Sequence, residues 1–117
     1  MYTMMQVCRE LDMTYQTLKF YCNEGVVPNG KRDHNNRRVF DEKNVKWIKD
    51  LTCLKKCGMS IQEMKKYLEL CLQGEATIVS RKKMLARKQE ELRASIKELE
   101  DSISYIGWKQ NFYDEVL

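Results

Sequence analysis

Apolar residues in the first part of the chain recur every three or four positions, which is the spacing of one face of an α-helix. They fall at positions 4, 7, 8 and 11, and again at 18, 21 and 22. Thr3 and Thr14 stand before these stretches and are suitable N-caps. Because only Asp12 and Met13 separate the first stretch from the second cap, the sequence predicts two short helices joined by a tight turn, a helix-turn-helix.

The helical pattern is interrupted over residues 26–40. Val-Val-Pro-Asn-Gly predicts a turn, a basic stretch follows, and Val39-Phe40 is a brief apolar return. Two short extended segments around such a stretch are typical of a β-hairpin. The sequence therefore predicts a small two-stranded wing with a basic tip.

Two more helices are expected between residues 41 and 74. Asp41 or Asn44 begins the first, which ends at Gly58. The pair Ser60 and Glu63 forms a capping box for the second, which ends near Gly74. The apolar stripe expected on the first of these helices consists of Trp47, Ile48, Leu51 and Leu54.

The sequence after Gly74 predicts one long helix over about residues 76–111, with an apolar residue at every seventh position. Heptads sustained over this length favour a coiled coil, because a lone helix so long needs a partner. The expected dimerisation residues are Ile78, Leu85, Leu92, Ile96, Leu99, Ile103 and Ile106. The fold class is thus mainly all-α, with a winged helix-turn-helix domain in residues 1–74 and a dimerisation helix in residues 75–117.

Charge along the long helix indicates the direction of pairing. Residues 81–88 hold five basic and no acidic groups, whereas residues 90–101 hold five acidic groups and two basic ones. Antiparallel pairing about a centre near Leu92 sets basic against acidic at both ends, and parallel pairing sets like against like. The prediction is an antiparallel coiled coil of two copies.

Composition narrows the class of protein. The chain has 117 residues, of which 32% are charged and 43% hydrophobic, as in a soluble protein of about one domain. The longest uncharged run, residues 1–8, is too short to span a bilayer, and because it lacks a basic start followed by an apolar stretch it is not expected to be a signal peptide. Five cysteines without a C-x-x-C spacing and a single histidine favour a reducing, cytoplasmic setting.

The excess positive charge lies in the first half of the chain. Residues 1–58 hold eleven Lys and Arg against seven Asp and Glu, while residues 59–117 hold ten of each. Residues 31–38 alone carry four basic groups and one acidic group. A patch of this kind is expected of a protein that binds a polyanion. A solvated surface loop is the other interpretation, and charge alone does not decide between them.

Three segments together resemble the DNA-binding half of MerR-type transcriptional regulators: MTYQTLKFYCNEGVV, NNRRVFDEKNV and GMSIQEMKKYL. The resemblance covers residues 2–72, and Glu24 to Asn29 match the family's turn into the wing. Three residues depart from the family pattern. Lys19 replaces an arginine, Phe20 replaces a tyrosine, and Arg37 replaces the wing tyrosine.

This resemblance implies a DNA-binding site. The first turn of the second helix faces base edges, Lys19 and Tyr21 reach phosphates, and the wing grips the backbone a second time. Phe20 either contacts DNA or packs under the wing. The candidate DNA-binding residues are Thr14, Tyr15, Gln16, Thr17, Lys19, Phe20, Tyr21, Lys31, Arg32, Asn36, Arg37 and Arg38.

The family also implies a homodimer on promoter DNA that activates RNA polymerase by distorting the duplex. The alternative is a coiled-coil interaction module whose basic head is incidental. No nucleophile–base pair, phosphate loop or carboxylate dyad predicts catalysis, and no cofactor or metal is expected.

Cysteines are the candidates for a signal. The long helix leaves no room in this chain for a ligand-binding domain, and no cysteine beyond Cys71 suggests a metal loop. Cys8, Cys22 and Cys71 are expected in the core. Cys53 lies opposite the apolar stripe, where Lys49 and Lys56 favour the reactive thiolate.

A small subgroup of the resembling family, responsive to aldehydes and nitrosothiols, carries a cysteine at the position of Cys53. Three interpretations of this residue stay open. It is a sensor thiol, a thiol packed in an interface, or one of two metal ligands with Cys57. Cys57 can resolve an oxidised Cys53 only if the helix deforms.

Overall fold

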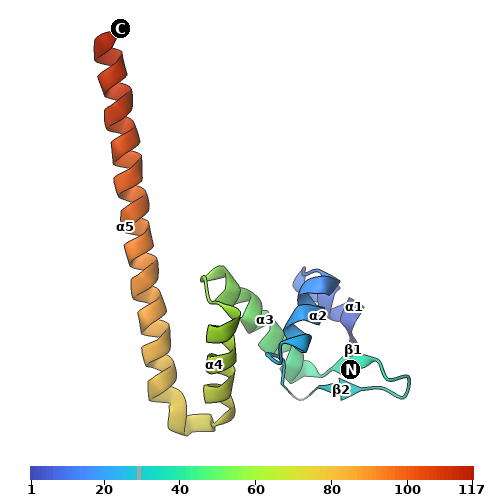
Figure 1. Ribbon diagram of the computed structural model, residues 1–117. Helices are drawn as coiled ribbons and strands as arrows, with labels where there is room; N and C mark the ends of the chain where they lie inside the picture. Colours follow the sequence, from blue (N-terminus) through green and yellow to red (C-terminus); the bar gives the residue numbers. More distant parts are fainter. Residues whose placement is uncertain (29) are drawn as a thin grey trace. The chain divides into compact units, whose positions relative to one another are not determined.

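The computed structural model describes residues 1–28 and 30–117, so Asn29, matched above to the turn before the wing, lies outside the described residues. The described chain forms two units, Met1–Ile78 and Val79–Leu117. Figure 1 shows the elements in chain order. They are β1 (Tyr2–Thr3), α1 (Met4–Leu11), α2 (Tyr15–Asn23), β2 (Lys31–Arg32), β3 (Arg38–Phe40), α3 (Glu42–Lys56), α4 (Ile61–Leu72), the 3₁₀ helix η1 (Gly74–Thr77) and α5 (Ile78–Val116).

Helices α1 and α2 form the predicted helix-turn-helix. Thr3 and Gln6 cap α1 reciprocally, with each side chain accepting a hydrogen bond from the other residue's backbone N–H. Asp12 adopts a left-handed conformation with φ 51° and ends α1. Val7 and Leu18, both fully buried, belong to one core cluster that fixes the two helices together.

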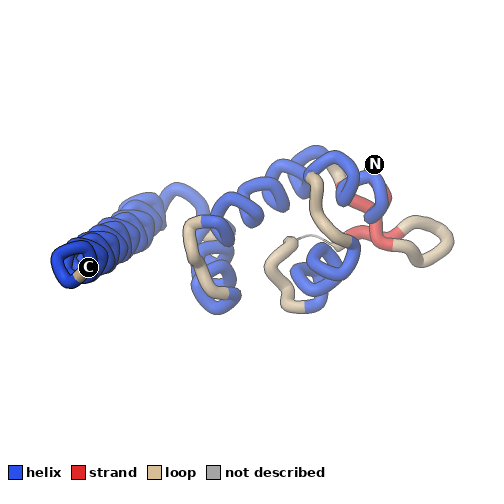
Figure 2. The backbone as a smooth tube through the Cα atoms, turned by 90° about the horizontal axis from the view of Figure 1, so that it is seen from above, coloured by secondary structure: helices blue, strands red, loops and turns tan. Residues whose placement is uncertain are grey.

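The predicted two-stranded wing is confirmed as β2 and β3, and the sheet has a third strand, β1, that the sequence did not predict. β3 is central and pairs antiparallel with both neighbours, in the order β1-β3-β2. Tyr2 pairs with Phe40, and Lys31 pairs with Val39. The sequence gives no sign of β1 because this strand is only two residues long and shows no alternation before the cap of α1. Figure 2 shows the strands gathered at one end of this unit, with the wing loop extending beyond them.

Helices α3 and α4 complete the first unit. Asp41, not Asn44, is the N-cap of α3, and Ser60 and Glu63 form the predicted capping box of α4. Ile48 and Leu51 of the predicted stripe are fully buried. Trp47 donates from Nε1 to the Val26 carbonyl oxygen at 2.6 Å, which ties α3 to the end of the helix-turn-helix.

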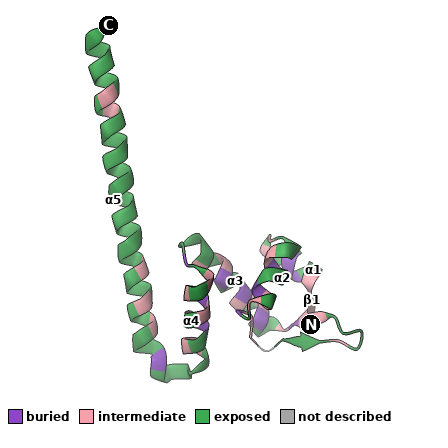
Figure 3. Cartoon of the chain, in the orientation of Figure 1, coloured by how far each residue is buried: buried purple, intermediate pink, exposed green. Residues whose placement is uncertain are grey.

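Helix α5 runs from Ile78 to Val116 and is five residues longer at its C-terminal end than predicted. None of its residues is buried (Figure 3). The predicted dimerisation residues are all exposed, from 39% at Leu85 to 72% at Ile103. Among the residues that the structure describes, no helix is long and apolar enough to cross a membrane. A long exposed apolar stripe requires a partner surface.

Candidate nucleic-acid interface

The first turn of α2 is held in place by its own threonines. Thr14 Oγ1 accepts a hydrogen bond from the Thr17 backbone N–H at 3.1 Å and donates to Thr17 Oγ1 at 2.8 Å. Tyr15, at 47% exposure, and Gln16 project from this rigid turn into solvent. The two threonine hydroxyls therefore position the turn, while Tyr15 and Gln16 offer the side chains that can read a ligand.

A hollow of about 580 Å³ lies between the start of α1, the exposed side of α2 and the wing. Its lining brings together predicted residues from separate segments. These are Tyr15, Lys19, Arg32, Asn36, Arg37 and Arg38, joined by Thr3, Met4 and Met5. The four cations among them face a common space, which suits a polyanion. We call this space the wing hollow.

The wing tip is a preorganised turn. Asp33 Oδ1 accepts hydrogen bonds from the backbone N–H groups of Asn35 and Arg37, at 2.9 and 3.0 Å. Asn36 has φ 62°, a left-handed conformation that asparagine tolerates better than most residues. Arg32 donates from Nη1 to the Asn36 carbonyl oxygen at 2.9 Å. The tip thus keeps its shape through its own side chains.

The wing itself carries four cations, which are Lys31, Arg32, Arg37 and Arg38. Three of them already have a protein partner. Lys31 forms an ion pair with Asp41 at 3.0 Å, Arg32 bonds to the tip, and Arg38 donates from Nη2 to Asn23 Oδ1 at 2.9 Å. Within residues 1–28 and 30–117, Arg37 alone of the four makes no side-chain hydrogen bond or ion pair. Arg37 is exposed and is therefore the wing cation most available to a phosphate.

Tyr21 corrects one expectation. Its side chain is 3% exposed, and its hydroxyl is buried with no hydrogen-bond partner in the described chain. Burial raises the pKa of Tyr21. A hydroxyl in that position does not reach a phosphate oxygen, so Tyr21 is a core residue here, as its place beside Leu18 on the apolar face of α2 indicates.

Comparison with known proteins identifies the family. The model for the MerR HTH family regulatory proteins matches residues 2–71, and the model described as MerR, DNA binding, matches residues 45–106. The chain belongs to the MerR family. It is a DNA-binding transcriptional regulator of the MerR type, and this class of protein is not enzymatic.

Individual MerR relatives resemble the chain over most of its length. An uncharacterised HTH-type regulator of Haemophilus influenzae is 31% identical over 97% of this chain and 84% of its own. The regulator AdhR of Bacillus subtilis is 33% identical over 74% of this chain and 62% of its own. The crystal structure of HiNmlR, described as a MerR family regulator lacking the sensor domain and bound to promoter DNA, is 31% identical. It superposes with a TM-score of 0.77 over 97% of this chain and 90% of that one.

A second hollow, of about 310 Å³, borders the other side of α2. It is lined by Thr14, Gln16, Thr17, Phe20 and Tyr21 from α2 and its cap, and by Lys55, Met59, Ile61 and Met64 from α3 and α4. Phe20, at 46% exposure, lies at this surface rather than under the wing. We call this space the α4 hollow.

The sequence did not identify Lys55 or Ile61 as part of a surface shared with α2. The available signals were the basic pair Lys55-Lys56 and the capping box that opens α4 directly after it. The first turn of a helix carries unpaired backbone N–H groups that favour anions. Only the fold brings this turn beside α2.

The five cysteines of this MerR chain differ in burial, and Cys71, expected in the core, is half-buried on α4. Cys8 is buried and Cys22 half-buried, both against the core cluster. Burial raises the pKa of both thiols, although Arg38 opposes the rise at Cys22. Cys53 and Cys57 are exposed, so Cys53 does lie away from the apolar stripe of α3. The described residues contain no group of three or more His, Cys, Asp or Glu side chains arranged to hold a metal ion.

Proposed function

We propose that this MerR regulator binds promoter DNA as a homodimer, with α2 of each copy in the major groove and each wing on the flanking backbone. The observation that carries the proposal is the wing hollow, where Tyr15 and Lys19 of α2 meet Arg32, Arg37 and Arg38 of the wing. The likeness to HiNmlR, whose structure is described as bound to promoter DNA, supports it.

Tyr15 and Gln16 read bases in this proposal, and the cations hold phosphates. Replacing Tyr15 or Gln16 by alanine then costs about 1–3 kcal/mol on the preferred sequence and little on random duplex. The binding test is fluorescence anisotropy with the duplex upstream of the protein's own gene and with a shuffled duplex, over a range of salt. Equal affinity for the two sequences would refute sequence-specific recognition and favour an interaction module with an incidental basic head.

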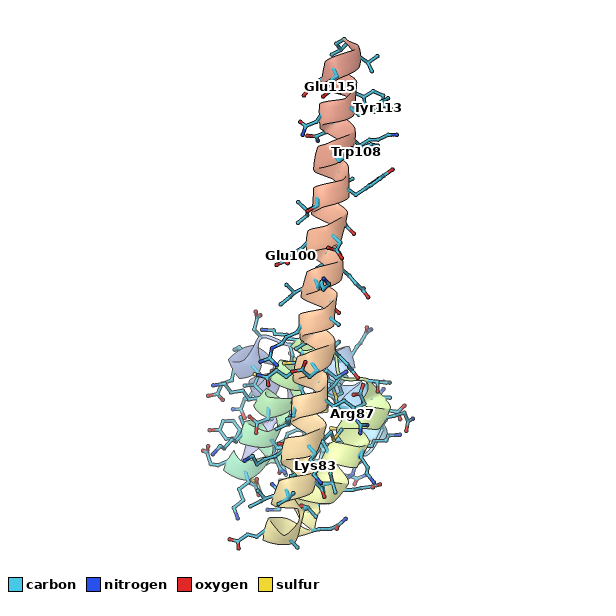
Figure 4. All side chains as sticks on the ribbon, turned by 90° about the vertical axis from the view of Figure 1, so that its left-hand side faces the viewer. Lys83, Arg87, Glu100, Trp108, Tyr113 and Glu115 are labelled. Atoms are coloured by element: carbon cyan, nitrogen blue, oxygen red, sulfur yellow. The ribbon has the colours of Figure 1, made fainter. Side chains whose placement is uncertain are left out.

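The dimer is supported by α5. Its exposed apolar stripe needs a partner, and a second copy offers a matching one. Figure 4 shows Lys83 and Arg87 on the first half of this helix and Glu100 further along it. Antiparallel pairing about Leu92 sets Lys83 of one copy near Glu100 of the other. It also separates the two heads, as half-sites about 34 Å apart require.

Disulfide crosslinking tests the direction of pairing. In a variant with the native cysteines replaced by serine, cysteines at Lys82 and Ile103 should crosslink to each other between copies, because pairing about Leu92 sets them side by side. A variant with a cysteine only at Lys82 is the control and should stay uncrosslinked. Ready self-crosslinking of that control would mean parallel pairing.

The signal in this proposal is a thiol-reactive compound that acts on Cys53 of a protein in the cytoplasm, and the response is a change in transcription by RNA polymerase at the bound promoter. The exposure of Cys53 supports this role, since a sensor thiol must meet its reagent. Alkylation should be faster at Cys53 than at buried Cys8, as measured by peptide mapping. Equal rates at the two would leave Cys53 without a sensing role.

A further inference from the structure

Cys53 and Cys57 stand at the C-terminal end of α3, and both are exposed. Cys57 is the C-cap, and its backbone N–H donates to the Cys53 carbonyl oxygen at 3.1 Å. Residues four apart on a helix lie on the same face, one turn from each other. The two thiols therefore share one solvent-facing turn.

Their spacing is close to that of a disulfide but not equal to it. Cβ atoms of helical residues four apart are about 5–6 Å from each other, and a disulfide needs about 3.5–4.5 Å. The end of α3 must therefore close by roughly 1–2 Å. Cys57 lies outside the helix, with φ −78° and ψ 1°, so only the hydrogen bonds of the last turn have to change.

We propose that Cys53 and Cys57 form a dithiol site that a hydroperoxide converts to an intramolecular disulfide. This rests on the proposed role of Cys53 as the responsive thiol. The Cys53 thiolate attacks the outer oxygen of the hydroperoxide, the O–O bond breaks, and an alcohol leaves with a sulfenic acid on Cys53. The Cys57 sulfur then displaces hydroxide, which leaves as water with the Cys57 proton. Two thiols lose two electrons in all, and these reduce one hydroperoxide to alcohol and water.

The bridge acts on the surface beside α2 because the turn it closes leads directly into α4. Gly58, with φ +85°, donates its N–H to the Lys55 carbonyl oxygen at 2.9 Å, and Met59 donates to Leu54 at 3.2 Å. This is a Schellman cap. Met59 is 5% exposed and lines the α4 hollow together with Lys55. A contraction between Cys53 and Cys57 thus displaces the wall of that hollow.

Such a bridge is also easily undone. A disulfide held away from its preferred geometry is strained and more readily reduced than a relaxed one. Small thiols of a reducing compartment therefore restore the dithiol once the oxidant is consumed. Without Cys57, the sulfenic acid on Cys53 would stay open to further, irreversible oxidation. With Cys57 present, it is converted to a disulfide that can be reduced again.

The test uses the full chain, hydrogen peroxide and peptide mapping. Trypsin cuts after Lys49, Lys55, Lys56 and Lys65, so Cys53 and Cys57 fall on separate peptides, 50–55 and 57–65. The wild-type protein treated with peroxide should give these two peptides joined by a disulfide, and dithiothreitol should separate them. Cys53→Ser and Cys57→Ser should not form the joined pair, and Cys71→Ser, the matched control, should form it as wild type does.

A second measurement follows the intermediate. In Cys57→Ser the sulfenic acid on Cys53 has no nearby thiol to condense with, so labelling by dimedone should rise at least about tenfold over wild type. Equal dimedone labelling in the two proteins, or joining of Cys53 to Cys71 or to a second copy, would overturn the dithiol site. It would leave Cys53 as a reactive thiol and the proposed function intact.

DNA affinity completes the test. The peroxide-treated wild type should differ at least about fivefold from its reduced form in affinity for the preferred duplex, and Cys57→Ser should lose this difference while binding as wild type when reduced. Unchanged affinity in a fully bridged protein would overturn the link to the α4 hollow. A reduced wild type that fails to bind DNA would instead contradict the proposed function itself.

Discussion

Arg37→Ala is the sharpest probe of the wing. Arg37 is exposed, it lines the wing hollow, and its guanidinium has no partner in the described chain. Its removal therefore breaks no side-chain hydrogen bond or ion pair among the described residues. Arg38→Ala is less clean, because it also removes the 2.9 Å hydrogen bond to Asn23 that ties the wing to α2. That bond is worth about 0.5–1.5 kcal/mol in net stability.

The size of the Arg37 effect follows from counterion release. Each phosphate contact contributes about 0.9 to the slope of log K against log salt. A homodimer loses two contacts, so the slope should become shallower by about 1.8. Over a fourfold change in salt, from about 50 to 200 mM, the affinity ratio of wild type to variant should narrow about 12-fold, or about 1.5 kcal/mol.

Anisotropy titrations at five or six salt concentrations measure this slope on both specific and random duplex, and the change should be the same on each. Lys66→Ala is the matched control, because Lys66 is exposed on α4 and lines neither hollow. An Arg37→Ala slope that equals the wild-type and Lys66→Ala slopes would refute the assignment of the wing to the DNA backbone. A change of about 0.9 would mean that only one wing of the dimer touches phosphate.

Two further predictions concern the head. Tyr21→Phe removes a buried hydroxyl without a partner in the described chain. It should therefore raise the free energy of unfolding by up to about 1–2 kcal/mol and leave DNA affinity unchanged. Weaker DNA binding by this variant would show instead that the Tyr21 hydroxyl contacts DNA. Hydrogen bonds from the Asn44 backbone and the Lys31 ammonium hold the pKa of Asp41 below its ordinary value. The carboxylate thus stabilises the fold above the ordinary carboxyl pKa, and this contribution disappears as pH falls through the lower folded value. The free energy of unfolding of the wild type should exceed that of Asp41→Asn by a constant amount above this acidic range, and the difference should shrink within it, as measured by urea unfolding. A difference that persists to the most acidic pH would show that the Asp41 carboxylate is not its source.

The sequence predicted the helices well because their ends are marked chemically. Thr3, Thr14 and Ser60 are caps whose side chains accept backbone N–H groups in the structure. The end of α5 was less well predicted, since Gly107 weakens the helical signal there. Trp108 stacks on Tyr105 and on Phe112, with ring centroids 6.0 Å apart in each case. These contacts at helical spacing support the helix up to Val116.

The candidate site was predicted in part. Periodicity alone put Tyr21 on the apolar face, and the structure confirms that placement, whereas its expected phosphate contact came from the family pattern. The two hollows could not be derived from local sequence. Each depends on side chains far apart in the chain, such as Met5 with Arg37 and Phe20 with Ile61, and only tertiary packing brings such pairs together.

The hydrogen bonds that the wing cations make within the protein affect how much each cation can add to the affinity for DNA. Lys31 and Arg38 hold protein oxygens in the unbound state, so a phosphate that takes them must replace an existing hydrogen bond. The net gain per cation is then small, because one charge-assisted contact is exchanged for another. What the pairs supply is orientation, since side chains already fixed lose little entropy on binding. Arg37 loses more entropy but gives up no partner. In the proposed complex, the wing therefore combines positioned cations that set its register on the DNA backbone with Arg37, which gains a phosphate contact without giving up a protein partner.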